Sequence, residues 1–190
     1  MKHNRRGRIL IAVLLAAQYV SLYLVYGEDL CDVPLLGLAA ATAGAALRQA
    51  SGKGAGEFAA FALIWWLVTI LLTGDTYEAW GRKLLSGLLG GGVLLAGAFL
   101  LRMIAARYWK RHNQEGELFA RSDCAFLALP GFYFGIAVGV PGFLIELLLA
   151  LTAGNVRLDR RIPTGVAAFV SCWLCALLGE RFMTWYIGFF

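Results

Sequence analysis

Charged residues are scarce in this chain: they make up 15% of its 190 residues, whereas apolar residues make up 60%. A soluble domain of this length could not bury so much apolar surface, because small domains leave much of their chain exposed to water. Together with a mean hydropathy of +0.70, this composition excludes an ordinary soluble globular protein. It predicts a protein whose main solvent is lipid.

The residues of several common catalytic and metal sites are also missing. The two histidines, His3 and His112, stand alone in basic segments, and the sequence has no serine protease triad, zinc-binding histidine helix or glycine-rich phosphate loop. Cys172 and Cys175 form a Cys-x-x-Cys pair but lack the second pair of a zinc site. We interpret the cysteines as packing or lipid-facing residues rather than metal or redox groups, and we expect no cofactor.

The net charge of +5 does not indicate a nucleic-acid partner. The 17 Lys and Arg residues fall mostly in short loops between apolar runs, which is the distribution that membrane topology requires. Neither a basic helix nor an aromatic RNA-reading motif is present. The partner that the composition predicts is the lipid bilayer.

Long apolar runs dominate the sequence instead. A helix that crosses the hydrocarbon core of a bilayer needs about 20 apolar residues. We therefore predict one all-α membrane domain over residues 1–190, a polytopic bundle of about six or seven transmembrane helices. The first run lacks a small-x-small cleavage site, so we interpret it as a retained anchor rather than a signal peptide. The predicted spans lie near residues 8–26, 33–47, 57–73, 84–104, 124–138, 140–154 and 163–179.

The run 124–153 is too long for one span and short for two. If it is a hairpin and the N-terminus is inside, 14 of the 17 basic residues lie inside, and only Arg82, Lys83 and Arg181 lie outside. This is the asymmetry that the positive-inside rule describes. The sequence thus predicts a multi-pass protein of the cell inner (cytoplasmic) membrane, with a cytoplasmic N-terminus, seven helices and an outer C-terminus.

Two segments in the second half of the chain resemble the type IV prepilin peptidase family, which includes the preflagellin peptidases. In that family a Gly-x-Gly-Asp motif ends a cytoplasmic loop and opens a helix, and an Ile-Pro-Phe-Gly-Pro segment opens the last helix. The first segment here reads Arg121-Ser122-Asp123-Cys124-Ala125-Phe126-Leu127-Ala128-Leu129-Pro130-Gly131. The second reads Arg161-Ile162-Pro163-Thr164-Gly165-Val166-Ala167. The resemblance covers roughly the last 75 residues in order, spacing and sidedness.

The resemblance implies the fold of that family and an aspartic endopeptidase that removes basic leader peptides from pilin-like precursors at the cytoplasmic face. Two carboxylates would share one proton, one acting as base for the attacking water and the other as acid. Asp123 would be one of them, and Asp75, at the end of an apolar run, would be its partner. The chain would then be an enzyme of type IV pilus biogenesis and protein secretion, with pilin-like precursors as partners. No segment resembles the zinc loop of many bacterial members.

The chain departs from the family motif at defined positions. Ala120 and Ser122 replace its two glycines, and Ala125 replaces its lysine. The family also has two helices between its aspartates, whereas only 84–104 is predicted between Asp75 and Asp123, which puts them on opposite faces. One alternative is therefore a catalytically silent relative that binds or assembles membrane partners. Asp123 would then be only a helix N-cap, and Asp75 only a loop carboxylate.

Two further carboxylates stand out. Glu146 lies in the middle of an apolar run, where a charged side chain costs at least about 2.5 kcal/mol. It is a candidate intramembrane acid: the partner of Asp123, part of a proton or ion path in a small transporter, or a neutral residue bonded to a neighbouring helix. Glu57 opens a span on the same side as Asp123, where a carboxylate complements the helix dipole.

Overall fold

The computed structural model describes residues 3–26, 33–50, 55–73, 77–111, 123–154 and 164–187. These residues form helices and contain no strand, which confirms the predicted all-α class. The helices are α1 (His3–Tyr26), α2 (Val33–Ala50), α3 (Gly56–Thr73), α4 (Tyr77–Arg111), α5 (Asp123–Gly154) and α6 (Thr164–Ile187).

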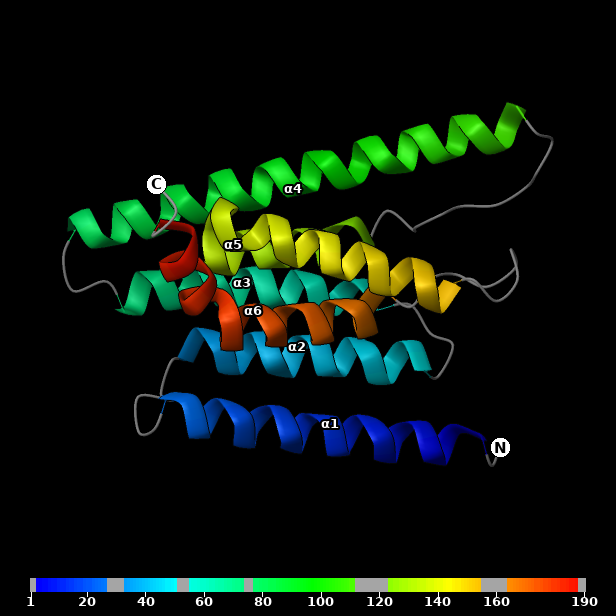
Figure 1. The fold of residues 1–190 in the computed structure, drawn as a ribbon, viewed down its shortest axis with the longest axis horizontal. Helices are drawn as coiled ribbons and strands as arrows, with labels where there is room; N and C mark the ends of the chain where they lie inside the picture. Colours follow the sequence, from blue (N-terminus) through cyan, green and yellow to red (C-terminus); the bar gives the residue numbers. More distant parts are fainter. Residues whose placement is uncertain are drawn as a thin grey trace.

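The helices lie side by side in a bundle, with α1 along one edge and α4 along the other (Figure 1). α1 packs mainly on α2, whereas α4 packs mainly on α5, and α6 lies between α2 and α5. The indole of Trp173 on α6 donates a hydrogen bond of 3.0 Å to Ser21 on α1. The start of α1 and the end of α6 lie at opposite ends of the bundle.

α4 is longer than the span predicted within it. Its 35 residues correspond to about 52 Å, whereas the hydrocarbon core of a bilayer is about 30 Å thick. The last turn carries Lys110 and Arg111, and both side chains are exposed. In Figure 1 this end of α4 extends beyond the neighbouring helices.

α5 is a helical hairpin. Gly135 has a φ of 72° and a ψ of −176°, a conformation that glycine adopts readily and other residues do not. A Cβ added to Gly139 would lie 2.6 Å from the Cα of Gly131, and one added to Gly142 would lie 2.9 Å from Pro130. Residues eight apart in a straight helix are separated by about 12 Å, so these contacts require a reversal of the chain. The hairpin predicted within 124–153 thus turns at Gly135.

The first arm of this hairpin is short. It runs from Asp123 to the residue before Gly135, about 12 residues or about 18 Å, where the sequence predicted a span over 124–138. At the turn, the Phe132 ring packs edge-on against Trp66, with 5.3 Å between ring centroids. Trp66 lies near the middle of α3, and in Figure 1 the turn stops short of the ends of α3 and α4. The hairpin therefore does not fill the far end of the bundle.

Glycines bring α4 and α5 into close contact. A Cβ on Gly90 would lie 2.6 Å from the carbonyl oxygen of Gly131, and one on Gly131 would lie 2.6 Å from the backbone of Gly90. The Gly90-Gly91-Gly92 run lies within an apolar stretch, where small residues allow helices to pack closely. Gly90 and Gly91 are buried against the hairpin, whereas a Cβ on Gly92 would meet nothing within 4 Å.

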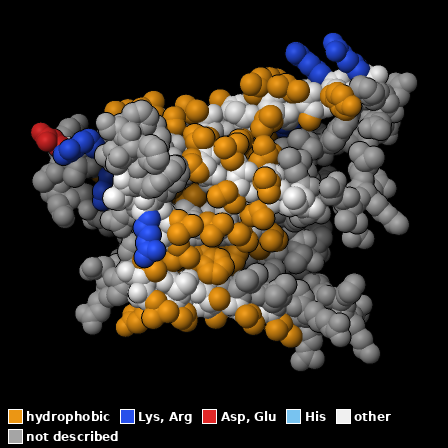
Figure 2. All heavy atoms as spheres, viewed as in Figure 1, with side chains coloured by type: hydrophobic (Ala, Val, Ile, Leu, Met, Phe, Trp, Pro, Cys, Tyr) orange, Lys and Arg blue, Asp and Glu red, His pale blue; other side chains and the backbone are white. Residues whose placement is uncertain are grey.

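The surface of the bundle is apolar between its ends. Figure 2 shows hydrophobic side chains across the middle of the molecule, and Lys and Arg side chains toward its ends. Two helical stretches of the described residues are long and apolar enough to cross a membrane, Trp80–Tyr108 and Cys124–Leu149. The second contains the reversal at Gly135. Shorter apolar stretches cover Ala16–Val25, Gly56–Leu72 and Thr164–Gly179. These features support association with a membrane.

Candidate functional site

Asp123 is the first residue of α5, as predicted; its side chain lies outside the described atoms. The next residue, Cys124, is fully buried and shares a core cluster with Ala98 of α4 and Ala167 of α6. Phe126 packs in a second cluster with Ala45 of α2 and with the start of α3. The end of α2 and the starts of α3, α5 and α6 therefore meet at one end of the bundle, which we call the Asp123 end.

Asp75 lies outside the described residues. The helix ends on either side of it are Thr73, the last residue of α3, and Tyr77, the first residue of α4. Along α4, Tyr77 is about 21 residues, or about 32 Å, from Ala98, which packs beside Cys124. The helices that flank Asp75 therefore reach the end of the bundle opposite Asp123, and the described fold does not bring the two predicted catalytic positions together.

The resemblance matches the family's first aspartate to Asp75 by sequence, whereas the helix order of that family would place it at the end of α2. That aspartate should lie two helices before the helix of Asp123 and at the same end of the bundle. In this fold α3 and α4 are the two intervening helices, so the position falls at the C-terminal end of α2. This end carries Arg48 and Gln49, and no aspartate or glutamate occurs between them and Glu57.

Gln49 joins α2 to the start of α6. Its side-chain nitrogen donates a hydrogen bond of 3.2 Å to the hydroxyl of Thr164, and its side-chain oxygen accepts one of 2.7 Å from the backbone N–H of Gly165. Thr164 is fully buried. The two partners belong to the segment that resembles the Ile-Pro-Phe-Gly-Pro motif. Sequence reasoning missed Gln49, although counting two helices back from Asp123 would have pointed to the end of α2.

Glu57 is the carboxylate at the start of α3, at the Asp123 end. It lies in the first turn of α3, as predicted, and both of its oxygens contact the guanidinium of Arg48, the longer contact being 3.3 Å. The two side chains are 76% and 37% exposed, and an ion pair so exposed contributes about 0–1 kcal/mol. This pairing gives Glu57 a local structural role beside the end of α2.

Glu146 lies in the second arm of α5 and is fully buried. The hydroxyl of Ser171 on α6 donates a hydrogen bond of 3.4 Å to its Oε2, whereas its Oε1 has no partner among the described atoms. No described Lys or Arg forms an ion pair with it. Its neighbours Phe143 and Leu147 pack in the same cluster as Cys124, so Glu146 belongs to the half of the hairpin nearer the Asp123 end.

The described part of the chain contains no group of three or more His, Cys, Asp and Glu side chains that could hold a metal ion. Comparisons of the chain with models of protein families, with curated proteins and with solved structures each found no match. The resemblance to the prepilin peptidases therefore rests on the quoted residues.

Proposed function

We propose that this chain is a multi-pass protein of the inner (cytoplasmic) membrane and a catalytically silent relative of the prepilin peptidases, which binds pilin-like precursors without cleaving them. The observation that carries this proposal is Gln49. An amide stands at the end of α2, where the family resemblance calls for a carboxylate on the same side as Asp123.

Chemistry explains why this substitution matters. Hydrolysis by an aspartic protease needs two carboxyl groups that share a proton, because one must accept a proton from water while the other donates one. An amide cannot accept that proton, and both polar atoms of the Gln49 side chain are already bonded to the start of α6. Of the other described carboxylates on this side, Glu57 is paired with Arg48, and Glu146 accepts a hydrogen bond from Ser171.

The direction of each helix supports this membrane placement. With the start of α1 in the cytoplasm, α1, α2, α3, α4 and α6 each cross the bilayer, and α5 enters and leaves from the cytoplasmic side. Backbone that reverses inside a membrane is tolerated where protein buries it, and Gly135 is buried. The Asp123 end is then cytoplasmic, beside the basic end of α4, which agrees with the positive-inside rule.

The test uses the purified full-length chain and pilin-like precursors encoded by the same genome. We expect the precursors to bind the parent chain and Asp123→Asn equally in a pull-down from detergent, and to remain uncleaved after incubation with either. Cleavage gained by Gln49→Asp would support the missing carboxylate as the cause of silence.

Cleavage by the parent chain that disappears in Asp123→Asn would overturn this proposal in favour of an active endopeptidase. Asp75→Asn, Glu146→Gln and Glu57→Gln would then identify the second carboxylate. Absence of both cleavage and binding would refute the assignment of pilin-like precursors as partners.

A further inference from the structure

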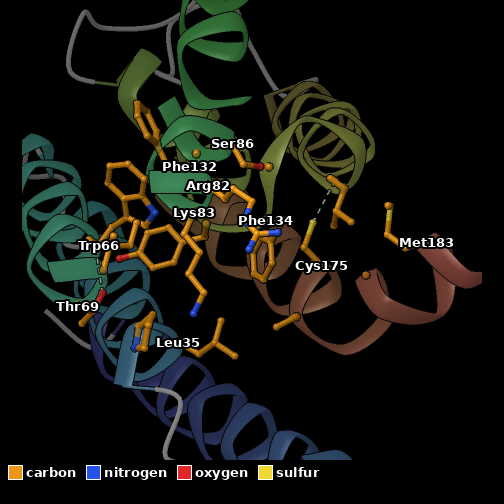
Figure 3. Close-up of a pocket in the computed structure, with 18 residues that line it drawn as sticks. Leu35, Trp66, Thr69, Arg82, Lys83, Ser86, Phe132, Phe134, Cys175 and Met183 are labelled. Carbon is orange, nitrogen blue, oxygen red and sulfur yellow. Dashed lines mark hydrogen bonds between the residues drawn. The ribbon is translucent and has the colours of Figure 1, made fainter. Parts of the chain in front are cut away.

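The short first arm of α5 leaves a cavity at the end of the bundle opposite Asp123. Its volume is about 660 Å³, within the range of about 300–1,000 Å³ that is usual for ligand sites. The cavity lies beyond the turn at Gly135, between the starts of α2 and α4 and the ends of α3 and α6. Figure 3 shows the side chains that surround it.

The walls of the cavity are largely apolar and aromatic. Trp66, Phe132, Tyr133 and Phe134 line it, together with aliphatic residues such as Leu35. The hydroxyl of Tyr133 donates a hydrogen bond of 2.7 Å to the backbone oxygen of Ala62, so this polar group is already satisfied. These walls suit an apolar chain rather than a polar solute.

Two cations stand at the same cavity. Arg82 and Lys83, near the start of α4, line it, and no Asp or Glu is among the lining residues that the structure describes. Among the described side chains, the acidic partner of Arg82 is Glu78, whose carboxylate is 4.0 Å from the guanidinium in a pair that is more than three-quarters exposed on both sides. Such a pair is weak, so both cations are available to an anion.

The positions of these cations are unusual for the proposed topology. Arg82 and Lys83 are two of the three Lys and Arg residues that fall outside the cytoplasm, the side that the positive-inside rule depletes of basic residues. A requirement for positive charge at this cavity explains why they stand there. Cationic side chains next to an apolar, aromatic cavity match an anionic headgroup attached to a hydrocarbon chain.

We propose that this cavity binds an anionic phospholipid from the outer leaflet. The phosphate contacts Arg82 and Lys83, and part of an acyl chain lies against Trp66 and Phe134. The cavity holds the headgroup and the first part of the chain, while the rest of the lipid stays in the bilayer. The inference concerns the end of the bundle away from Asp123 and is independent of whether the chain cleaves a substrate.

The experiment compares phosphatidylglycerol with phosphatidylcholine by native mass spectrometry of the full-length chain in detergent. The parent chain should retain phosphatidylglycerol in preference to phosphatidylcholine. The double substitution Arg82→Gln/Lys83→Gln should weaken that binding by at least about tenfold, since each basic side chain contributes to attraction of an anionic lipid. The matched control is Lys110→Gln/Arg111→Gln, which removes the same charge from exposed positions at the other end of α4 and should leave binding unchanged.

A second measurement tests the apolar wall. Phosphatidylglycerol with brominated acyl chains should quench tryptophan fluorescence, and Trp66→Phe should remove a part of the quenching that Trp173→Phe leaves in place. Equal retention of the two lipids, equal loss in the two double substitutions, or quenching insensitive to Trp66→Phe would each overturn the proposal. Displacement of the lipid by millimolar inorganic phosphate would identify a site for a soluble anion instead.

Discussion

At the residue scale, Gln49 holds the start of α6 against the end of α2 through both polar atoms of its side-chain amide. The buried partner groups, Thr164 and the N–H of Gly165, would have no other bond from α2 if this amide were absent. A buried polar group left without a partner costs about 1–3 kcal/mol. Gln49 therefore has a structural role whatever the function of the Asp123 end.

Gln49→Ala should lower the free energy of unfolding by about 1–3 kcal/mol. Gln49→Glu should lower it much less, because a carboxylate still accepts from Gly165 N–H and lies favourably near the start of α6. Thermal unfolding of the two variants in the same detergent measures the difference. Equal losses in both would contradict the assigned hydrogen bonds.

The burial of the Glu146 carboxyl group predicts how substitutions at this position change stability. Glu146→Gln should change stability by no more than about 1 kcal/mol, since an amide oxygen still accepts the hydrogen bond from Ser171. Glu146→Lys should cost at least about 2.5 kcal/mol, because it places an unpaired cation inside the bundle. Yield and melting temperature in detergent report both effects. If Glu146→Lys is as thermostable as the parent, the side chain faces water and its assigned burial is wrong.

The sequence alone pointed to Glu146 and Asp123, because each is unusual among its neighbours in the chain. It did not point to Gln49. A glutamate inside an apolar run and an aspartate before a helix are unusual in themselves, and Glu146 and Asp123 occupy the predicted kinds of place. Gln49 lies in the last turn of the alanine-rich helix α2. Its role depends on the contact between α2 and α6, which the sequence does not indicate. The partnership of Asp75 with Asp123 stays a prediction, since Asp75 lies outside the described residues.

At the element scale, α5 shows what a hydrophobic run can and cannot predict. Its length and the distribution of basic residues predicted a hairpin. The predicted spans, 124–138 and 140–154, put the turn at Gly139, whereas the structure has it at Gly135. The backbone contact between Gly90 and Gly131 places the reversal at Gly135 and makes the first arm short.

Alanine substitutions in the glycine run of α4 should separate packing from helix propensity. Gly90→Ala adds a methyl group 2.6 Å from backbone atoms of the hairpin, so α4 and α5 must move apart and stability should fall by about 1–3 kcal/mol. Gly92→Ala meets open space and should stabilise the chain by about 0.5–1 kcal/mol. Melting temperatures in one detergent compare the two, and a loss at Gly92 equal to that at Gly90 would refute the close contact.

At the scale of the whole molecule, the described helices overlap the predicted apolar runs. Two described stretches are long and apolar enough to cross a bilayer, so the bundle of six or seven membrane spans stays a prediction. The helix ends correspond less well, since α4 continues past the predicted 84–104 at both ends. Amphipathic and charged turns extend a helix without lengthening its apolar core. The topology inferred from charge therefore needs a direct test.

Cysteine labelling along α4 provides this test, because the helix has described, exposed residues at both ends. Cys124, Cys172 and Cys175 are buried, and Cys31, which lies outside the described residues, is replaced by serine. In this background, Arg82→Cys should react with a membrane-impermeant maleimide added to intact cells, whereas Lys110→Cys should react only after the cells are opened. Both sites are exposed, so accessibility alone does not separate them. The reverse pattern would invert the proposed topology and place the Asp123 end outside.

The hairpin of α5 has a consequence for how the protein is made. In the proposed topology its two ends stay on the cytoplasmic side, so no polar segment after α4 has to be translocated until α6 inserts. The first arm needs the glycine face of α4 to bury its backbone. Insertion of α5 should therefore follow insertion of α4, the helix that the ribosome completes first.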